Sequence, residues 1–323
     1  MNLSEKTSNK IQVLRGLAII AVVFIHNTPG GLAQVWCRPF INFSVGLFLF
    51  LSGLLSSVEK WNPKKRIIKV IIPYFIWTLV YVVIYNYKTP YSLPLIYVKN
   101  LLTANSAAIM YYIFVYCEFT LLIPLIDKLS KSKIKWIGFL ISPVEIIVMR
   151  LFPLILGYEL NKYVAMVLNI SCLGWFTYFY LGYLIGNKRI EIKASTLKLV
   201  VAWGIAIVLQ ILEGYWYLSM GEQNCGTQVK LLAILAGSLF MLLAYKYITY
   251  ENAPSSKFLK ILGDKSFGIY FSHLAIMSVL GKIPFYKTIV IYPFNAIVAI
   301  MVSLICVIIG GKILGRFAKY LAL

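Results

Sequence analysis

The sequence predicts an all-α, polytopic membrane protein with about ten transmembrane helices. Hydrophobic residues make up 60% of the 323-residue chain and charged residues only 13%, whereas soluble domains are roughly 45–50% apolar. The apolar residues form continuous runs of membrane-spanning length instead of the ~10-residue alternating segments of a β-barrel. These two observations exclude an ordinary soluble protein.

Apolar runs of about 17–25 residues, the length that crosses a bilayer, define the expected spans. The predicted spans are 11–28, 39–58, 67–87, 107–127, 134–152, 163–186, 196–219, 228–248, 265–281 and 291–315. The first run contains Arg15 and His26 and is not followed by a small-residue cleavage site, so we expect a retained span instead of a signal peptide. No loop is long enough for a soluble domain, and we therefore expect one membrane domain over residues 1–323.

Positive charges orient these spans. With the N-terminus in the cytoplasm, 23 of the 31 Lys and Arg residues fall on the inner side and 8 on the outer side. Because cytoplasmic loops carry the excess of Lys and Arg, this split predicts that both termini are cytoplasmic. It also explains the net charge of +20 by topology, so no nucleic-acid partner is expected. The lysine- and isoleucine-rich composition suggests a bacterial plasma membrane.

The first span contains Arg15 and His26, eleven residues apart. Eleven helical residues advance about 16 Å and rotate about 1100°, which leaves the two side chains about 20° apart on one face. Ionisable groups at membrane depth usually face a protein interior and indicate function. A neutral imidazole can take a proton from a hydroxyl, and Arg15 can hold an anion. The simpler alternative is that Arg15 extends to the inner interface and His26 lies among the outer headgroups.

A basic cluster precedes the third span, with Lys64, Lys65, Arg66 and Lys69 before Pro73. Arg66 and Lys69 are three residues apart, so both cations lie on one helical face. On the cytoplasmic side they are candidates for binding a phosphate-rich donor such as coenzyme A. Topology and contact with anionic lipids explain the cluster equally well.

Three glutamates lie within predicted spans, namely Glu118, Glu145 and Glu213. An intramembrane Glu needs a partner or must be protonated, and Glu118 is a candidate to pair with Arg15 or a histidine. The tyrosines that precede Glu118 are interpreted as packing and interface residues. The five cysteines have no CxxC spacing, so no metal site is expected.

The second histidine lies in the segment LGDKSFGIYFSH, residues 262–273. Tyr270 and His273 are three residues apart and therefore neighbours on one helix face, and Ser266 is a candidate cap for the start of that helix. A buried histidine with a purely structural hydrogen bond is as common as a catalytic one. Tyr270 and His273 are therefore candidate site residues only.

Taken together, these segments resemble the acyltransferase 3 family of integral membrane acyltransferases. The first span of that family typically carries Arg-x10-His, as Arg15 and His26 do here. Four other segments resemble family elements in the same order. They are FINFSVGLFLFLSGLL at 40–55, RIIKVIIPY at 66–74, MYYIFVYCEFTLLIPLI at 110–126 and KSFGIYFSH at 265–273. Lys69 stands where the family commonly has Arg.

The resemblance implies an O-acetyltransferase that moves an acyl group, usually acetyl, from cytoplasmic acetyl-CoA to a hydroxyl of a glycan or a lipid-linked sugar. His26 would be catalytic, with Arg15, Arg66 and Lys69 binding or positioning the donor. Some relatives carry a Glu-Glu pair in the aromatic-rich segment, whereas this chain has Tyr116-Cys117 followed by Glu118. We expect no soluble esterase-like domain to be fused to the membrane domain.

Two alternatives remain open from the sequence. A transporter or flippase would use Arg15, Glu118 and the histidines as a substrate or proton path, and it would take up substrate without acyl-CoA. A scaffold for glycan synthesis would tolerate substitution of both histidines. The acceptor, the acyl group and the oligomeric state have no fingerprint in the sequence.

Overall fold

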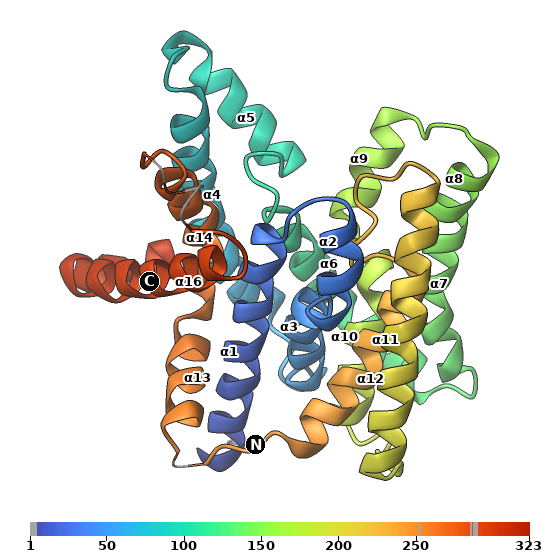
Figure 1. Ribbon diagram of the computed structural model, residues 1–323. Coiled ribbons are helices and arrows are strands. Elements are labelled where there is room, and N and C mark those ends of the chain that lie inside the picture. Colours follow the sequence, from blue (N-terminus) through green and yellow to red (C-terminus); the bar gives the residue numbers. More distant parts are fainter. Residues whose placement is uncertain (1–4, 252, 285, 287–289) are drawn as a thin grey trace.

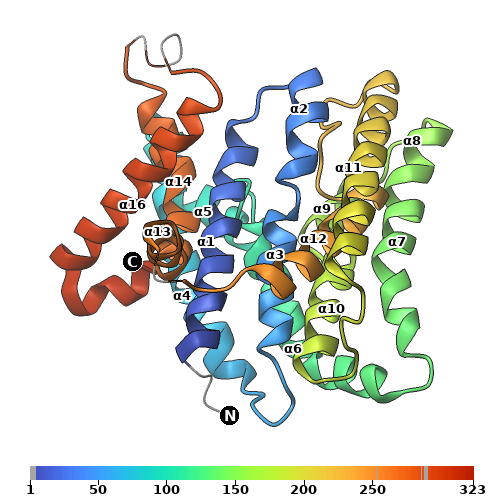
Figure 2. The ribbon, with the colours of Figure 1, turned by 60° about the horizontal axis from the view of Figure 1, so that its bottom comes forward.

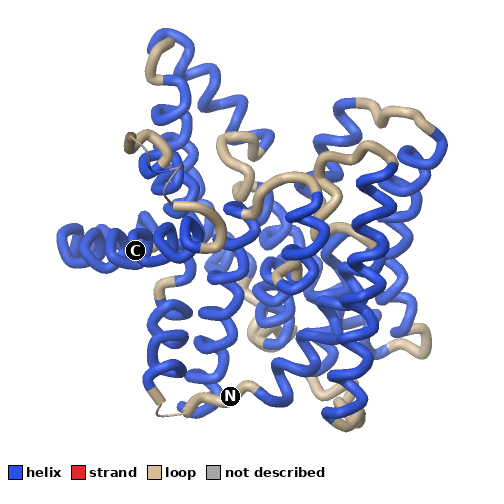
Figure 3. Tube along the Cα trace, viewed as in Figure 1, coloured by secondary structure: helices blue, strands red, loops and turns tan. Residues whose placement is uncertain are grey.

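Helices account for all the regular secondary structure in the computed structural model, which describes residues 5–251, 253–284, 286 and 290–323. Within these residues there is no strand, and the predicted all-α fold is confirmed (Figures 1 and 3). In chain order the α-helices are α1 (Glu5–Asn27), α2 (Leu32–Cys37), α3 (Phe43–Leu54), α4 (Pro63–Asn86), α5 (Leu93–Thr103), α6 (Tyr111–Lys131), α7 (Ile141–Ile146), α8 (Phe152–Leu156), α9 (Lys162–Ile170), α10 (Phe176–Gly186), α11 (Thr196–Ser219), α12 (Leu231–Tyr247), α13 (Pro254–Asp264), α14 (Ser266–Leu280) and α16 (Phe294–Leu314). Short 3-10 helices join several of them, namely η1 (Arg38–Phe40), η2 (Pro90–Ser92), η3 (Lys135–Leu140), η5 (Leu173–Trp175) and η6 (Gly315–Leu321). The segment η4 (Ile147–Leu151) is a short π-helix.

A helix occupies every one of the ten predicted spans, although not all of them have the length and apolarity of a membrane crossing. Six described segments do: Glu5–Asn27, Leu32–Leu54, Pro63–Asn86, Lys135–Leu156, Thr196–Ser219 and Phe294–Leu321. A seventh is obtained if α9 and the segment Leu173–Gly186, bent by 40° at their junction, form one broken span. The remaining helices are shorter, as α12 and α14 are, or contain several charged residues, as α6 does. Ten crossings and cytoplasmic termini therefore stay predictions.

Helix α1 lies in the middle of the fold. Figure 2 shows α13, α14 and α16 on one side of α1 and α3 on the other. Most residues of α1 from Ile11 to Ile25 are buried, and its apolar side chains belong to the largest core cluster. Side chains that α1 directs at α14 are thus enclosed by protein.

Two glycines bring α1 and α13 into backbone contact. A Cβ added to Gly16 would lie 2.0 Å from the carbonyl oxygen of Leu259, and one added to Gly263 would lie 1.8 Å from that of Gln12. Small residues permit such close approach of helices in membranes. Helix α13 lies between the predicted spans 228–248 and 265–281, in a segment where no helix was predicted. Helix α13 is short and carries Lys257 and Lys260, so no long apolar run revealed it.

Replacing Gly16 with alanine is expected to destabilise the protein, because its Cβ would overlap the Leu259 backbone. Overpacking of this kind costs about 1–3 kcal/mol, and the thermal midpoint of the protein in detergent measures it. Gly204→Ala on α11 is the matched control, since a Cβ there meets nothing within 4 Å. An equal midpoint for both variants would contradict the close packing of α1 and α13.

Residues 88–106, which lie between the predicted spans 67–87 and 107–127, contain helix α5, which folds back along α4 (Figure 1). The Tyr74 hydroxyl of α4 donates to the Leu101 carbonyl of α5 at 2.8 Å. Less than one turn further along α4, Trp77 Nε1 donates to the Leu321 carbonyl at 3.0 Å. This bond holds the C-terminal segment η6 against α4. Arg66 and Lys69 lie near the start of α4.

Candidate functional site

The two histidines of the chain lie in contact. The ring centroids of His26 on α1 and His273 on α14 are 5.3 Å apart and their planes are tilted by 47°. His26 lies ten residues after Gly16, and His273 lies ten residues after Gly263. These are the two glycines at which α1 and α13 are in backbone contact. Because α1 and the α13–α14 segment run side by side in the same direction (Figure 1), equal intervals bring the two rings to the same level.

His273 is completely buried. Its Nδ1 lies 3.0 Å from the Ile269 carbonyl, and its Nε2 is buried with no hydrogen-bond partner among the described residues. A carbonyl oxygen can only accept, so the proton of a neutral ring belongs on Nδ1, which leaves Nε2 as an acceptor. His273 therefore holds an unused acceptor in the space that it shares with His26.

A tyrosine from α4 fixes the backbone on either side of His273. The buried Tyr81 hydroxyl donates to the Phe271 carbonyl at 2.6 Å and accepts from the Ala275 N–H at 3.2 Å. This hydroxyl ties α14 to α4 where His273 projects.

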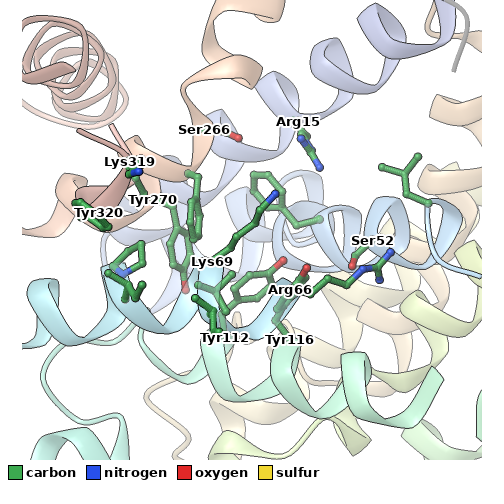
Figure 4. Close-up of a pocket in the computed structure, with 18 residues that line it drawn as sticks. Arg15, Ser52, Arg66, Lys69, Tyr112, Tyr116, Ser266, Tyr270, Lys319 and Tyr320 are labelled. Carbon is green, nitrogen blue, oxygen red and sulfur yellow. The ribbon is translucent and has the colours of Figure 1, made fainter. Parts of the chain in front are cut away.

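A cavity of about 730 Å³ lies on one side of the histidine pair, and we call it the basic cavity. Among the residues that the structure describes, four cations line it and no carboxylate does. The cations are Arg15 from α1, Arg66 and Lys69 from α4, and Lys319 from η6. Figure 4 shows the Arg15 side chain entering this space from α1 and the Arg66 and Lys69 side chains entering it from α4. Such a lining favours a ligand with several negative charges.

Hydroxyl groups complete the wall of the basic cavity. They come from Ser52, Tyr112, Tyr116, Ser266 and Tyr270. The Tyr270 hydroxyl donates to the Ile109 carbonyl, and the Tyr112 and Tyr270 rings lie 5.4 Å apart. Arg66 is held by a 2.8 Å hydrogen bond from its Nη1 to the hydroxyl of Ser56, at the C-terminal end of α3. The cations and hydroxyls are therefore fixed by elements distant in sequence.

A second cavity, of about 390 Å³, lies at the other end of α1, and we call it the histidine cavity. His26 lines it together with Asn27, Tyr292 and Asn295. The Asn27 side chain donates to the Val23 carbonyl at 2.8 Å. On the opposite side of the pair, His273 lies 6.3 Å from Tyr270, ring centroid to ring centroid. The histidine pair thus lies between the two cavities.

The structure brings most of the predicted site residues together. Arg15, Arg66, Lys69 and Tyr270 share the basic cavity, while His26 and His273 form the contact beside it. Arg15 shares a cavity with Tyr270 and His26 contacts His273, so both α1 side chains face α14.

Glu118 is separate from this group, and the expectation that it pairs with Arg15 or a histidine was wrong. Its carboxylate accepts a 2.6 Å hydrogen bond from the backbone N–H of Cys172, at the break between α9 and η5. Carboxylates are stabilising at such N-terminal positions. Glu145 pairs with Arg150 at 3.5 Å, and Glu213 accepts from the Leu232 N–H at 3.3 Å. These acids therefore complete local structure.

Several residues that line the basic cavity were not predicted from the sequence. Tyr112 and Tyr116 were assigned to packing, yet both line the basic cavity. Their spacing of four residues within an aromatic-rich helix was a signal that one face is shared. Lys319 was counted only as a topology charge, and no local pattern marks it. Its position depends on the contact between η6 and α4, which joins residues more than 240 positions apart.

Comparison with known proteins places the chain in a family. A family model described as an acyltransferase domain, acyltransferase 3, matches residues 8–310, nearly the whole chain. No curated protein and no solved structure matches it. The match spans both histidines and three of the four cations of the basic cavity, while Lys319 lies beyond it.

Proposed function

The chain belongs to the acyltransferase 3 family of membrane acyltransferases, and we propose that it transfers an acyl group from a cytoplasmic acyl-CoA to a glycan hydroxyl. The acyl group is acetyl in this proposal, and the glycan is a cell-surface or exported one, or a lipid-linked sugar precursor. The plasma membrane of a bacterium is the proposed location. One observation supports this best: the only two histidines touch each other between two cavities.

The basic cavity is the proposed binding site for the acyl-CoA. A coenzyme A molecule carries several phosphate charges, and Arg15, Arg66, Lys69 and Lys319 offer cations without a competing carboxylate in the lining. Arginine and lysine bind phosphate oxygens by charge-assisted hydrogen bonds. The donor thioester would extend past Tyr270 towards the histidine pair. No metal takes part in this proposal.

His26 is the proposed general base. It removes the proton of the acceptor hydroxyl as that oxygen attacks the acyl carbon, and the C–S bond of the thioester then breaks. The proton passes from His26 to the departing sulfur, so the histidine is regenerated. His273 is a positioning residue in this scheme. Its Nε2, which has no partner among the described residues, would accept an N–H from His26 during the reaction, which would fix the tautomer and leave the other His26 nitrogen free to act as the base.

Inverted membrane vesicles provide the test. Acetyl-CoA labelled in the acetyl group is supplied to the exposed cytoplasmic face, and label in the envelope glycan is counted. Vesicles containing the chain are expected to label the glycan well above vesicles without it. If they do not, but take up saccharide without any acyl-CoA, the transporter alternative replaces the proposal.

A further inference from the structure

A third cavity, of about 520 Å³, lies beside the histidine cavity and is not used in the proposed chemistry. We call it the arginine cavity. Two guanidinium groups and several amide side chains line it, from Arg38, Asn105, Arg150, Asn169, Asn224 and Gln228. They come from five separate segments of the chain, so the cavity is formed only in the folded protein.

The arginine cavity carries one cation without a counter-charge. Arg150 is paired with Glu145 at 3.5 Å, whereas no ion pair within the described residues involves Arg38. The Nε atoms of both arginines are buried and have no hydrogen-bond partner in the described part of the chain. Guanidinium groups bind anions through charge-assisted hydrogen bonds, and the charge of Arg38 has no carboxylate partner among the described residues. The expected ligand therefore carries a negative charge.

The rest of the lining suits a sugar ring. Tyr111 and Trp175 stack with their ring centroids 5.9 Å apart and their planes 23° apart, and both line the cavity. Aromatic rings supply flat apolar surface beside polar groups, which matches the C–H faces of a saccharide. The amides of Asn105 and Asn169 are exposed and offer both donors and acceptors to hydroxyl groups.

Buried polar contacts fix one wall of the arginine cavity in place. Gln34 Oε1 accepts from the Gly226 N–H at 3.2 Å, and Asn42 Nδ2 donates to the Gly226 carbonyl at 3.2 Å. The Ser44 hydroxyl donates to Gln228 Oε1 at 3.3 Å. Binding groups that are held before the ligand arrives lose less entropy on binding. The loop that carries Asn224 and Gln228 is therefore built as a preformed wall.

Arg38 connects this cavity to the histidine pair. Its Nη2 donates to the Ile25 carbonyl at 3.3 Å, and Ile25 directly precedes His26. A ligand held by Arg38 would extend from there towards the histidine cavity. We propose that the arginine cavity binds an anionic saccharide, one that carries a carboxylate or a phosphate, as the acceptor. The acceptor role rests on the proposed function, whereas the binding itself does not.

The test measures binding to the purified full chain by saturation-transfer nuclear magnetic resonance, without acyl-CoA. The probes are glucuronate, glucose 1-phosphate, glucose and glycerol 3-phosphate. Glucuronate or glucose 1-phosphate is expected to bind at least about fivefold more tightly than glucose, since one charge pair contributes about 1 kcal/mol. Glycerol 3-phosphate lacks the ring and is expected to bind more weakly than glucose 1-phosphate.

Two substitutions of asparagine by aspartate, at the two ends of α9, test the site. Asn169→Asp puts a negative charge into the cavity and is expected to remove the preference for anions. Asn161→Asp is the matched control on the same helix, about 12 Å away. Asn161 does not line the cavity and caps α9 by accepting from the Tyr163 N–H, which aspartate does equally well. The control is expected to keep the preference.

Three results would overturn the inference. The first is equal binding of glucose and its anionic counterparts. The second is an unchanged preference for anions in both Asn169→Asp and Arg38→Gln. The third is equal binding of glycerol 3-phosphate and glucose 1-phosphate. Acyl transfer to a neutral glycan without any anion preference would leave the proposed function intact and remove only this inference. Anion-selective sugar binding without acyl transfer would leave the saccharide site intact and remove the proposed function.

Discussion

Substitution of His26 by alanine is expected to reduce acyl transfer by about 10²–10⁴-fold, the range that a general base contributes. The imidazole lines the histidine cavity and contacts His273, so alanine removes the group that would take the hydroxyl proton. The rate of label transfer from acetyl-CoA to glycan, at matched protein level and with excess donor, measures the loss. The KM for acetyl-CoA is expected to change little, because the cations of the basic cavity are untouched.

His273→Phe is the comparison for this variant. Phenylalanine keeps the ring that fills the buried site but removes the Nε2 acceptor, so the loss of transfer is expected to be smaller than for His26→Ala. Both proteins should fold, which the thermal midpoint checks. Full activity of a folded His26→Ala protein would exclude His26 as the base, and equal activity of His273→Phe and wild type would exclude the positioning role of His273.

Substitution of Arg66 by glutamine is expected to raise the KM for acyl-CoA by about 10- to 100-fold, because hydrogen bonds to charged groups contribute about 1.5–3 kcal/mol. Arg66 lines the basic cavity and is held by Ser56, and glutamine removes its positive charge. The value of kcat should fall less, since the histidine pair is unchanged. Initial rates over a range of donor concentrations separate the two parameters.

Lys65→Gln is the matched control. Lys65 belongs to the same basic cluster and is exposed, but it does not line the cavity. Its KM is expected to stay within about twofold of wild type, in keeping with the small contribution of exposed charges. If the two substitutions raise the KM equally, the cluster acts through general surface charge and the donor site must lie elsewhere.

Local periodicity was sufficient for much of the site. The interval between Arg15 and His26 predicted that both would face the same way, and the three-residue spacing of Tyr270 and His273 did the same for α14. These predictions rest on geometry within one helix, which the sequence determines directly. The all-α fold followed from continuous apolar runs for the same reason.

Contacts between distant helices were beyond such reasoning. That His26 meets His273 depends on α13, a short helix in a segment where no helix was predicted, and on the backbone contact at Gly16 and Gly263. The position of Lys319 likewise depends on how η6 packs against α4. Glu118 was misjudged because its partner is a backbone N–H at a helix break, and no side-chain pattern reveals such a group.

We propose that the donor reaches the histidine pair through the basic cavity and the acceptor through the histidine cavity, from opposite faces of the membrane. Purified protein reconstituted in one orientation into vesicles tests it most directly, with labelled acetyl-CoA on one face and a saccharide acceptor on the other. The account predicts His26-dependent labelling only when the donor is on the side of the basic cavity and the acceptor on the side of the histidine cavity. Equal labelling with donor and acceptor together on one face would contradict it.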